Sequence, residues 1–403
     1  MNRPSPIKTA AGLVVLVVLI IALSWFSNRV WDVKSETLPE PDQLAIDLNM
    51  TVSQFGQAND LPDPLLKIIF GLEGKSELNK KLGDFGTAGQ LASMVEKKMA
   101  LAAENSSKNW MKIFLKFALW LVFLSLIFIF MKKQQHVSRF RKGLLFASVL
   151  LFGIVMGSDP SPMGTVKDAI HLYATVKVVF LPRLIALAVF LALVFLANKY
   201  ICAWGCQLGT LQDLIFRINQ SSRGKAVIGR QLKLPFILTN TVRLIFFLVF
   251  TAAAFLLAWD IVDPLDPFKI YKPAAIGLLG GLFIAALLVA SLFVYRPWCH
   301  FFCPFGLAGW LVEKISLVRI HVNYETCIAC QKCVAACPST VMAAILKQDK
   351  KTIPDCFACY ACREACPTGS IDFSMKKRTL PPANFFKNPA GQATSCDRIP
   401  VRR

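Results

Sequence analysis

The chain has 403 residues, of which 55% are hydrophobic and only 17% are charged, and its mean hydropathy is +0.51. A soluble domain carries charge on about a quarter of its residues, so this composition excludes an ordinary soluble protein. The formal net charge of +20 would suit nucleic-acid binding if it stood alone. Here the basic residues flank apolar runs, so the positive-inside rule accounts for them and no nucleic-acid partner is expected.

Long apolar runs predict a mainly α-helical, polytopic membrane protein in contact with the lipid bilayer. A helix needs about 20 apolar residues to cross a membrane. Six runs approach that length: 11–26, 110–131, 144–158, 179–197, 236–259 and 274–295. The first run follows Arg3 and Lys8, as in a signal peptide, but no small-residue cleavage site comes after it. We therefore expect residues 1–26 to be an uncleaved transmembrane anchor.

Charged loops predict the orientation of these runs. The loops after the second and fourth runs are basic, with Lys132, Lys133, Arg139, Arg141 and Lys142, then Lys199, Arg217, Arg223, Lys225, Arg230 and Lys233. The loops after the third and fifth runs carry Asp159, Asp168, Asp260, Asp263 and Asp266. Basic loops stay in the cytoplasm. Both termini are therefore expected inside, in a bacterial inner membrane, with residues 110–143 forming the second span and a basic loop.

Residues 27–109 are then expected outside the cytoplasm. This stretch is polar and contains no cysteine. Thr51-Val52-Ser53-Gln54 has the pattern of a capping box, which predicts the start of a helix, and the apolar stretch 65–72 follows two prolines. A small helical domain is expected. Its capping and apolar face favour docking to a membrane or extracytoplasmic redox partner protein over a plain linker.

Two C-x3-C motifs follow the fourth and sixth runs. The first contains Cys202 and Cys206, the second contains Cys299 and Cys303, and each has a glycine three residues after its second cysteine. An outer loop with Asp-Pro precedes each motif. Residues 144–313 are therefore interpreted as a duplicated two-helix membrane unit.

Such a duplication would bring the four cysteines together at the cytoplasmic surface of the membrane. Residues i and i+4 share one face of a helix, so Cys202 is expected beside Cys206, and Cys299 beside Cys303. Converging thiolates bind a third metal centre, such as a further cluster or copper, or form a dithiol redox pair. The alternative is that they are small buried apolar residues, which the repeated spacing makes the weaker interpretation.

A doubled C-x2-C-x2-C-x3-C-P motif carries the most specific chemistry. This spacing holds [4Fe–4S] clusters in bacterial two-cluster ferredoxins, where the fourth cysteine of each run binds the other cluster. The expected ligand sets are Cys327, Cys330, Cys333 and Cys366 for one cluster, and Cys337, Cys356, Cys359 and Cys362 for the other. Zinc seldom uses three thiols two residues apart, and disulfides do not suit the expected cytoplasmic side.

Residues 314–375 are thus expected to form an α+β two-cluster ferredoxin-like domain. Residues 376–403 form a basic, proline-containing tail with a lone Cys396. Arg243 lies inside the fifth run, where a charge is either a functional residue or snorkels to the surface. There is no C-x-x-C-H haem motif, phosphate-binding glycine loop or catalytic triad, so no catalytic residue is expected.

Taken together, the paired C-x3-C motifs and the doubled ferredoxin motif resemble membrane-bound polyferredoxins of the NosR/NapH type. The resemblance covers about residues 140–370 and extends to Pro304 and the twelve motif cysteines. Two features depart from it: Gln207 stands where the family has proline, and no large flavin-binding domain precedes the spans. The resemblance implies transfer of electrons from quinol toward reductases, or a role in maturation of copper oxidases.

The expected function is electron transfer between the quinone pool or membrane partners and a redox enzyme, through two [4Fe–4S] clusters. The protein would then be an electron-transfer subunit of a quinone-linked oxidoreductase rather than a stand-alone enzyme. The first alternative is an assembly factor that delivers or reduces copper for a respiratory metalloenzyme, with the C-x3-C thiols as the copper site. The second is a redox sensor that signals through residues 27–109.

Overall fold

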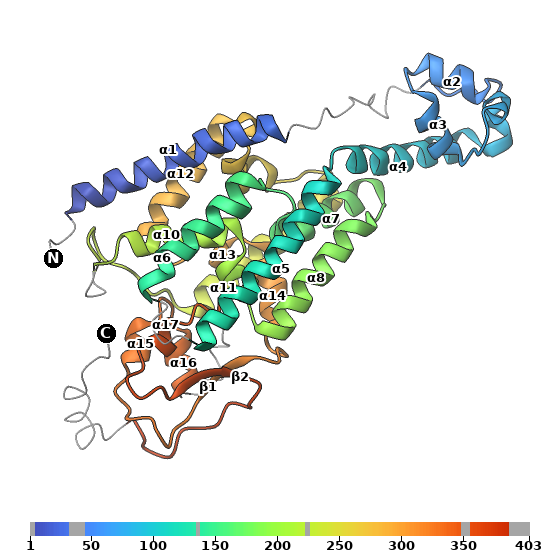
Figure 1. Cartoon of the computed structure of the whole chain (residues 1–403). Helices are drawn as coiled ribbons and strands as arrows, with labels where there is room; N and C mark the ends of the chain where they lie inside the picture. Colours follow the sequence, from blue (N-terminus) through green and yellow to red (C-terminus); the bar gives the residue numbers. More distant parts are fainter. Residues whose placement is uncertain (1–4, 32–44, 134–137, 222–225, 348–354, 387–403) are drawn as a thin grey trace.

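The computed structural model describes residues 5–31, 45–133, 138–221, 226–347 and 355–386. Figure 1 shows a bundle of long helices, a helical unit beyond one end and a small α+β segment at the opposite end. Some residues named above, or their side chains, lie outside the described parts of the chain. They are Arg3, Lys132, Lys133, Arg139, Arg223, Lys225, Cys396 and the rest of 387–403.

Among the described residues, three helices are long and apolar enough to cross a membrane: α1 (Pro6–Val30), α5 (Trp110–Lys133) and α11 (Phe236–Leu257). They correspond to the first, second and fifth predicted runs. At most 22% of the apolar window of each helix is buried inside the protein. Their outward side chains therefore suit contact with lipid rather than with water.

The other three predicted runs form shorter helices than the hydropathy count implies, so six full-length spans are not shown. Helix α8 (Leu181–Ala197) has 17 residues and α12 (Leu278–Phe293) has 16. The third run is divided between α6 (Ser138–Ser148) and a seven-residue π-helix, Val149–Val155. Helix α8 begins two residues after the predicted start and ends at the predicted end, whereas α12 begins four residues late and ends two residues early.

Both halves of the membrane part continue in the same way after these helices. A one-turn helix follows, α9 (Tyr200–Trp204) in the first half and α13 (Pro297–Phe301) in the second. A further helix then begins, α10 (Gln207–Ile218) or α14 (Pro304–Glu313). The repeated unit therefore includes a one-turn helix and another helix beyond the two that hydropathy predicts. The halves differ in their outer loops: the first has an α-helix, α7 (Pro162–Val176), and the second has three short 3-10 helices, Asp263–Leu265, Pro267–Tyr271 and Pro273–Ala275.

The helical unit beyond the bundle contains α2 (Val52–Ala58), α3 (Asp63–Phe70) and α4 (Ala88–Ser106), and it has a core of its own around Phe55 and Leu66. The capping box is present as predicted, because Thr51 Oγ1 accepts from the Gln54 backbone N–H at 3.2 Å and Gln54 Oε1 accepts from the Thr51 N–H at 2.9 Å. An ion pair of 2.5 Å between Glu104 and Arg183 attaches the unit to α8.

The α+β segment at the other end of the bundle has one antiparallel pair of strands, β1 (Arg319–Val322) and β2 (Ile371–Ser374). The helices α15 (Lys332–Ala336), α16 (Val341–Lys347) and α17 (Ala361–Glu364) lie between them in sequence. Figure 1 shows this segment beneath the ends of α5, α8 and α11. The eight ferredoxin-motif cysteines all lie within it.

Candidate functional site

The first group of cysteines surrounds one cavity. Cys327, Cys330 and Cys333 of the first run line it together with Cys366 of the second run. The cavity encloses about 350 Å³, and Val322, Leu346, Ile371 and Phe386 contribute apolar walls. Four thiols around an enclosed, largely apolar space fit a [4Fe–4S] cluster, whose ligands are thiolates of this kind.

The second group surrounds a neighbouring cavity. Cys356, Cys359 and Cys362 line it with Cys337 of the first run, around about 380 Å³. The fourth cysteine of each run thus lies with the first three of the other, in the grouping that the spacing predicts. Cluster binding itself stays a prediction. Cys356 and Cys362 are only 9% and 6% exposed, whereas all four cysteines of the first group are half-buried.

The two runs share an unusual backbone that sequence spacing alone does not reveal. Ala329 and Gln331 have φ values of 53° and 54°, and Ala358 and Tyr360, at the same positions of the second run, have 50° and 63°. Side chains other than glycine seldom adopt this left-handed region. Strained backbone of this kind is characteristic of functional sites. Here it occurs within the loops whose three thiols line each cavity.

The C-x3-C motifs differ from expectation, because the two cysteines of a pair do not share one helix. Cys202 lies in α9 and Cys206 is the N-cap of α10, while Cys299 lies in α13 and Cys303 is the N-cap of α14. The Cys206 N–H bonds Ile201 O at 2.8 Å, across five residues rather than four, and this contact closes the short helix. The chain then starts a new helix at the second cysteine.

The structure nevertheless brings the four membrane cysteines together. All are buried, at 7–8% exposure, and their thiols are close enough to interact electrostatically. Cys303 Sγ accepts a hydrogen bond from the Gly306 N–H at 3.3 Å. Within the described part of the chain, no three His, Cys, Asp or Glu side chains are placed to hold a single metal ion.

The glycine after each motif has a common structural role. A Cβ on Gly209 would lie 2.7 Å from Cys202 O, and a Cβ on Gly306 would lie 2.9 Å from Cys299 O. A Cβ atom essentially never lies within 3.0 Å of such a heavy atom. The new helix can therefore pack against the one-turn helix only where no side chain is present, which explains the repeated spacing of these glycines.

Basic side chains exchange contacts between the two motifs. Arg296, three residues before Cys299, donates to Cys202 O and also to Ala203 O, the latter at 2.9 Å. Lys199, three residues before Cys202, donates to Gly306 O at 3.0 Å. A basic side chain beside each motif therefore bonds backbone carbonyls of the other motif, and neither half can form these hydrogen bonds by itself.

Asp355 joins the ferredoxin-like segment to the membrane helices, and sequence reasoning missed it. It forms ion pairs with Lys199 and, at 3.0 Å, with Arg243. Arg243 is 1% exposed, so it does not snorkel to the surface. Burial alone would raise the pKa of Asp355, but the charges of Lys199 and Arg243 lower it to about 2. The only sequence signal for Asp355 is its place directly before Cys356.

Two further contacts strengthen this junction. Arg141 lies 2.8 Å from Glu364, which stands between two cysteines of the second run. Trp204, inside the first C-x3-C motif, donates through Nε1 to Ala358 O at 3.3 Å. The first membrane motif is thus in direct contact with the loop whose cysteines line the second cavity.

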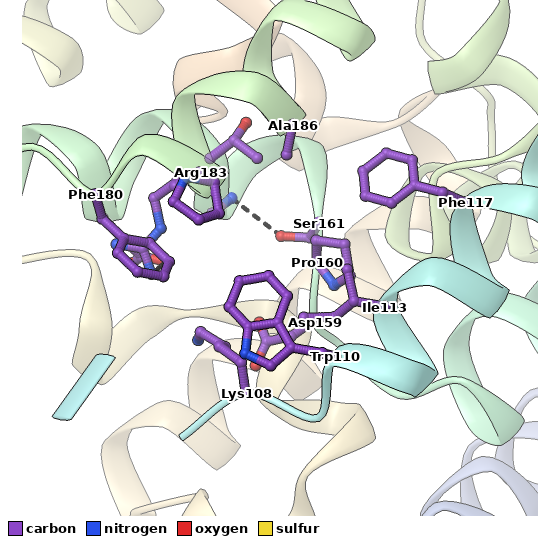
Figure 2. A pocket seen from close by; sticks show the side chains of 14 residues that line it. Lys108, Trp110, Ile113, Phe117, Asp159, Pro160, Ser161, Phe180, Arg183 and Ala186 are labelled. Carbon is purple, nitrogen blue, oxygen red and sulfur yellow. Dashed lines mark hydrogen bonds and ion pairs between the residues drawn. The ribbon is translucent and has the colours of Figure 1, made fainter. Parts of the chain in front are cut away.

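A different cavity lies at the opposite ends of α5 and α8 and encloses about 520 Å³. In Figure 2 the rings of Trp110, Phe117 and Phe180 surround it, and the polar side chains of Asp159 and Arg183 lie at its edge. Residues 159–161 of the loop 157–161 line it. No feature of the sequence other than the Asp-Pro pair marks this cavity.

The loop 157–161 also reaches the first cysteine motif. Gln207 Nε2 donates to Ser158 O at 2.7 Å, and Tyr271 Oη donates to Gln207 O at 2.9 Å. Gln207 directly follows Cys206, at the position where the family pattern has proline. Its side-chain amide, which proline lacks, binds the loop beside the outer cavity.

Comparisons with known proteins agree with this arrangement. A family model described as a 4Fe-4S dicluster domain matches residues 319–367, and one described as a 4Fe-4S binding domain matches residues 179–234 and 276–323. These matches, with the relatives below, support a polyferredoxin of the NapH type. No solved structure matches the chain significantly.

Three relatives of this chain are named for electron transport or as ferredoxin-type proteins. The putative electron transport protein YccM of Escherichia coli is 31% identical over 39% of this chain and 46% of its own. The ferredoxin-type protein NapH of Haemophilus influenzae is 27% identical over 36% and 48%. The methylamine utilization ferredoxin-type protein MauN of Methylorubrum extorquens is 31% identical over 48% and 64%. The chain spans about half the length of the first two.

Proposed function

We propose that the protein carries electrons between the quinone pool of a bacterial inner membrane and a redox partner protein, through two [4Fe–4S] clusters bound by the cysteines of the two cavities. It then serves as the electron-transfer subunit of a quinone-linked oxidoreductase. The contact between Trp204 and Ala358 carries the proposal, because it joins a membrane motif to the second cluster cavity. Electron transfer needs centres that are close and shielded from water.

The burial of the cysteines supports an order in which electrons pass between the two cavities. The second group is the more buried and lies against the membrane helices, whereas the first group is half-exposed. A cluster on the first group is accessible to a soluble partner, and one on the second group is accessible to the membrane part. Electrons then pass from the C-x3-C region to the second cavity and on to the first.

The outer cavity is the proposed site of the quinol ring. Its aromatic walls suit a flat ring, and Asp159, Ser161 and Arg183 offer polar atoms to the ring oxygens. Small-molecule sites combine an apolar lining with a few placed polar groups in this way. Oxidation of one quinol to quinone releases two electrons and two protons. The electrons pass one at a time to the clusters, and the protons leave at the outer face.

The proposed topology has six spans, with the ferredoxin-like domain in the cytoplasm. Basic residues of the predicted inner loops support it, since Arg141 and Lys199 contact that domain and Lys233 donates to Val334 O at 2.8 Å. Residues 27–109 then lie outside, where the independent core of α2–α4 can dock an extracytoplasmic partner.

Anaerobic purification in detergent, followed by iron analysis and electron paramagnetic resonance, tests the proposal. We expect at least about eight irons per chain, from two [4Fe–4S] clusters, and reduction of both signals by a short-chain quinol. Dithionite serves as a reductant that needs no quinol site. Iron below one cluster per chain would refute the proposal, and reduction by dithionite but not by any quinol would refute its quinone part.

A further inference from the structure

Lys116 is a buried cation inside the membrane part. Its side chain is 0% exposed, and Nζ donates to Gly157 O at 2.8 Å and to Asp159 O at 3.3 Å. Nζ also lies 4.9 Å from the centre of the Trp120 ring, whose Nε1–H donates to Gly205 O at 2.9 Å. The residue therefore lies between the loop at the outer cavity and the first cysteine motif.

Among the described residues, no carboxylate lies within 4.0 Å of the Lys116 ammonium group. The nearby Asp159 carboxylate pairs instead with Lys272, at 3.0 Å. Other buried cations beside the motifs do have carboxylate partners, in the pairs Lys199–Asp355, Arg243–Asp355 and Arg296–Asp213. A buried ammonium group without a compensating negative charge is costly. A different negative group is therefore expected within reach of Lys116.

Cys206 provides the position for that negative group. Its thiol interacts electrostatically with Lys116, and Cys206 is the N-cap residue of α10, so the thiol lies at the start of that helix. A helix N-terminus and a cation both stabilise a thiolate. The matched 4Fe-4S binding domain covers both C-x3-C motifs, and four buried thiols, two of them at helix N-termini, fit an anionic metal–thiolate cluster.

We propose that Lys116 is the counter-charge of a third [4Fe–4S] cluster held by Cys202, Cys206, Cys299 and Cys303, and that it sets the reduction potential of this cluster. The inference rests on the proposed electron path, because the cluster would stand between the outer cavity and the second ferredoxin cavity. Lys116 is a positioning residue: it touches the loop 157–161 and acts on the cluster through space.

The two halves of the membrane part differ in the groups that lie beside their cysteines. In the first half, Lys116 and Gln207 both bind the loop 157–161. In the second half Pro304 occupies the place of Gln207, and Cys303 receives its backbone donor from Gly306. The compensating charge therefore approaches the cluster from the side of the outer cavity, which is the side where electrons from quinol arrive.

A redox titration followed by electron paramagnetic resonance tests this role. Reduction adds one electron to the cluster, so loss of the nearby positive charge disfavours the reduced form. Lys116→Gln keeps a donor for the two carbonyls but removes the charge. We expect its third signal to shift to lower potential by at least a tenfold change in the reduced-to-oxidised ratio, about 59 mV for one electron. The two ferredoxin signals should not move.

Two variants complete the comparison. Lys116→Arg keeps the charge and is expected to titrate close to the wild type. Lys112→Gln removes a lysine one turn away on α5, whose Nζ lies 5.3 Å from the Trp31 ring, and should leave all potentials unchanged. An unshifted third potential in Lys116→Gln, or an equal shift in Lys112→Gln, would refute the counter-charge.

Wild-type protein gives an independent test that needs no variant of Lys116 to fold. A third cluster predicts about twelve irons per chain and a signal that Cys206→Ser removes. About eight irons with two signals would overturn the inference while leaving the proposed two-cluster function intact. Absence of the ferredoxin signals would instead count against the proposed function itself.

Discussion

Arg243 Nη1 lies 3.0 Å from Asp355 Oδ2, and both side chains are at least 98% removed from solvent. One residue belongs to a long apolar helix and the other directly precedes a predicted cluster ligand. Their ion pair, together with that of Lys199 on the same carboxylate, fixes the ferredoxin-like segment on the membrane helices.

Asp355→Asn should destabilise the junction strongly, because it leaves two buried cations without their partner. Breaking a buried ion pair from one side costs about 3–5 kcal/mol. Thermal unfolding in detergent should show a lower melting temperature and early loss of the second-cavity cluster. Asp372→Asn is the matched control, since Asp372 is 58% exposed and lies 3.9 Å from Arg363. Equal melting temperatures for the two variants would contradict this account of the junction.

The contribution of Asp355 should also depend on pH. Its pKa is lowered from 3.8 to about 2 in the folded protein, so the stabilisation is fully present above pH 4 and declines as the pH falls toward 2. The difference in melting temperature between wild type and Asp355→Asn should therefore shrink between pH 5 and pH 3. A difference that stays constant over this range would show that the carboxylate charge is not what stabilises the junction.

Cys366→Ala should remove the cluster of the first group, although Cys366 belongs to the second run in sequence. The reason is that Cys366 lines the cavity of Cys327, Cys330 and Cys333. Electron paramagnetic resonance should show loss of one signal, and it should be the signal that Cys330→Ala also removes. Cys396→Ala is the control and should retain both signals. If Cys366→Ala instead lost the signal of the cluster that Cys359 binds, the fourth cysteine of each run would bind the cluster of its own run.

Gly306→Ala should disturb the second membrane motif, because its Cβ would meet Cys299 O at 2.9 Å. Overpacking of this kind costs about 1–3 kcal/mol. Gly143→Ala is the control, since a Cβ at that helical position meets nothing within 4 Å. Melting temperatures in detergent should fall for the first variant only. A stable Gly306→Ala protein would show that the helix start can move away from the motif.

Ala186→Phe should fill the outer cavity, which Ala186 lines from α8. Reduction of the clusters by quinol is expected to slow by about tenfold or more, which corresponds to about 1.4 kcal/mol, while reduction by dithionite is unchanged. Val189→Phe adds the same ring to an exposed position of α8 and should have no effect. Unchanged quinol rates in Ala186→Phe would place the quinol site elsewhere.

The spacing of the ferredoxin cysteines reflects local backbone geometry that Ala329 and Ala358 repeat, and their assignment to two clusters stays a prediction. The capping box at Thr51 is equally local, and the structure contains it. Such features depend on few residues, so spacing is enough to find them.

Other features depend on contacts between distant parts of the chain and were not predictable. Hydropathy counts apolar residues but does not register where the backbone becomes helical, so α8 and α12 begin two and four residues inside their predicted runs. The helix breaks within the C-x3-C motifs have the same cause. Lys116 and Asp355 gain their roles from partners 41 or more residues away, which no spacing reveals.

The exchange of contacts between the two cysteine motifs has a consequence for biosynthesis. Lys199 needs Gly306 O and Asp355 as partners, and Cys202 O needs Arg296. A nascent chain that has been inserted only through α10 therefore holds a lysine and open carbonyls whose partners the ribosome has not yet made. The full set of these contacts can therefore form only after translation has passed residue 355, so the membrane motifs and the ferredoxin-like segment complete each other late in synthesis.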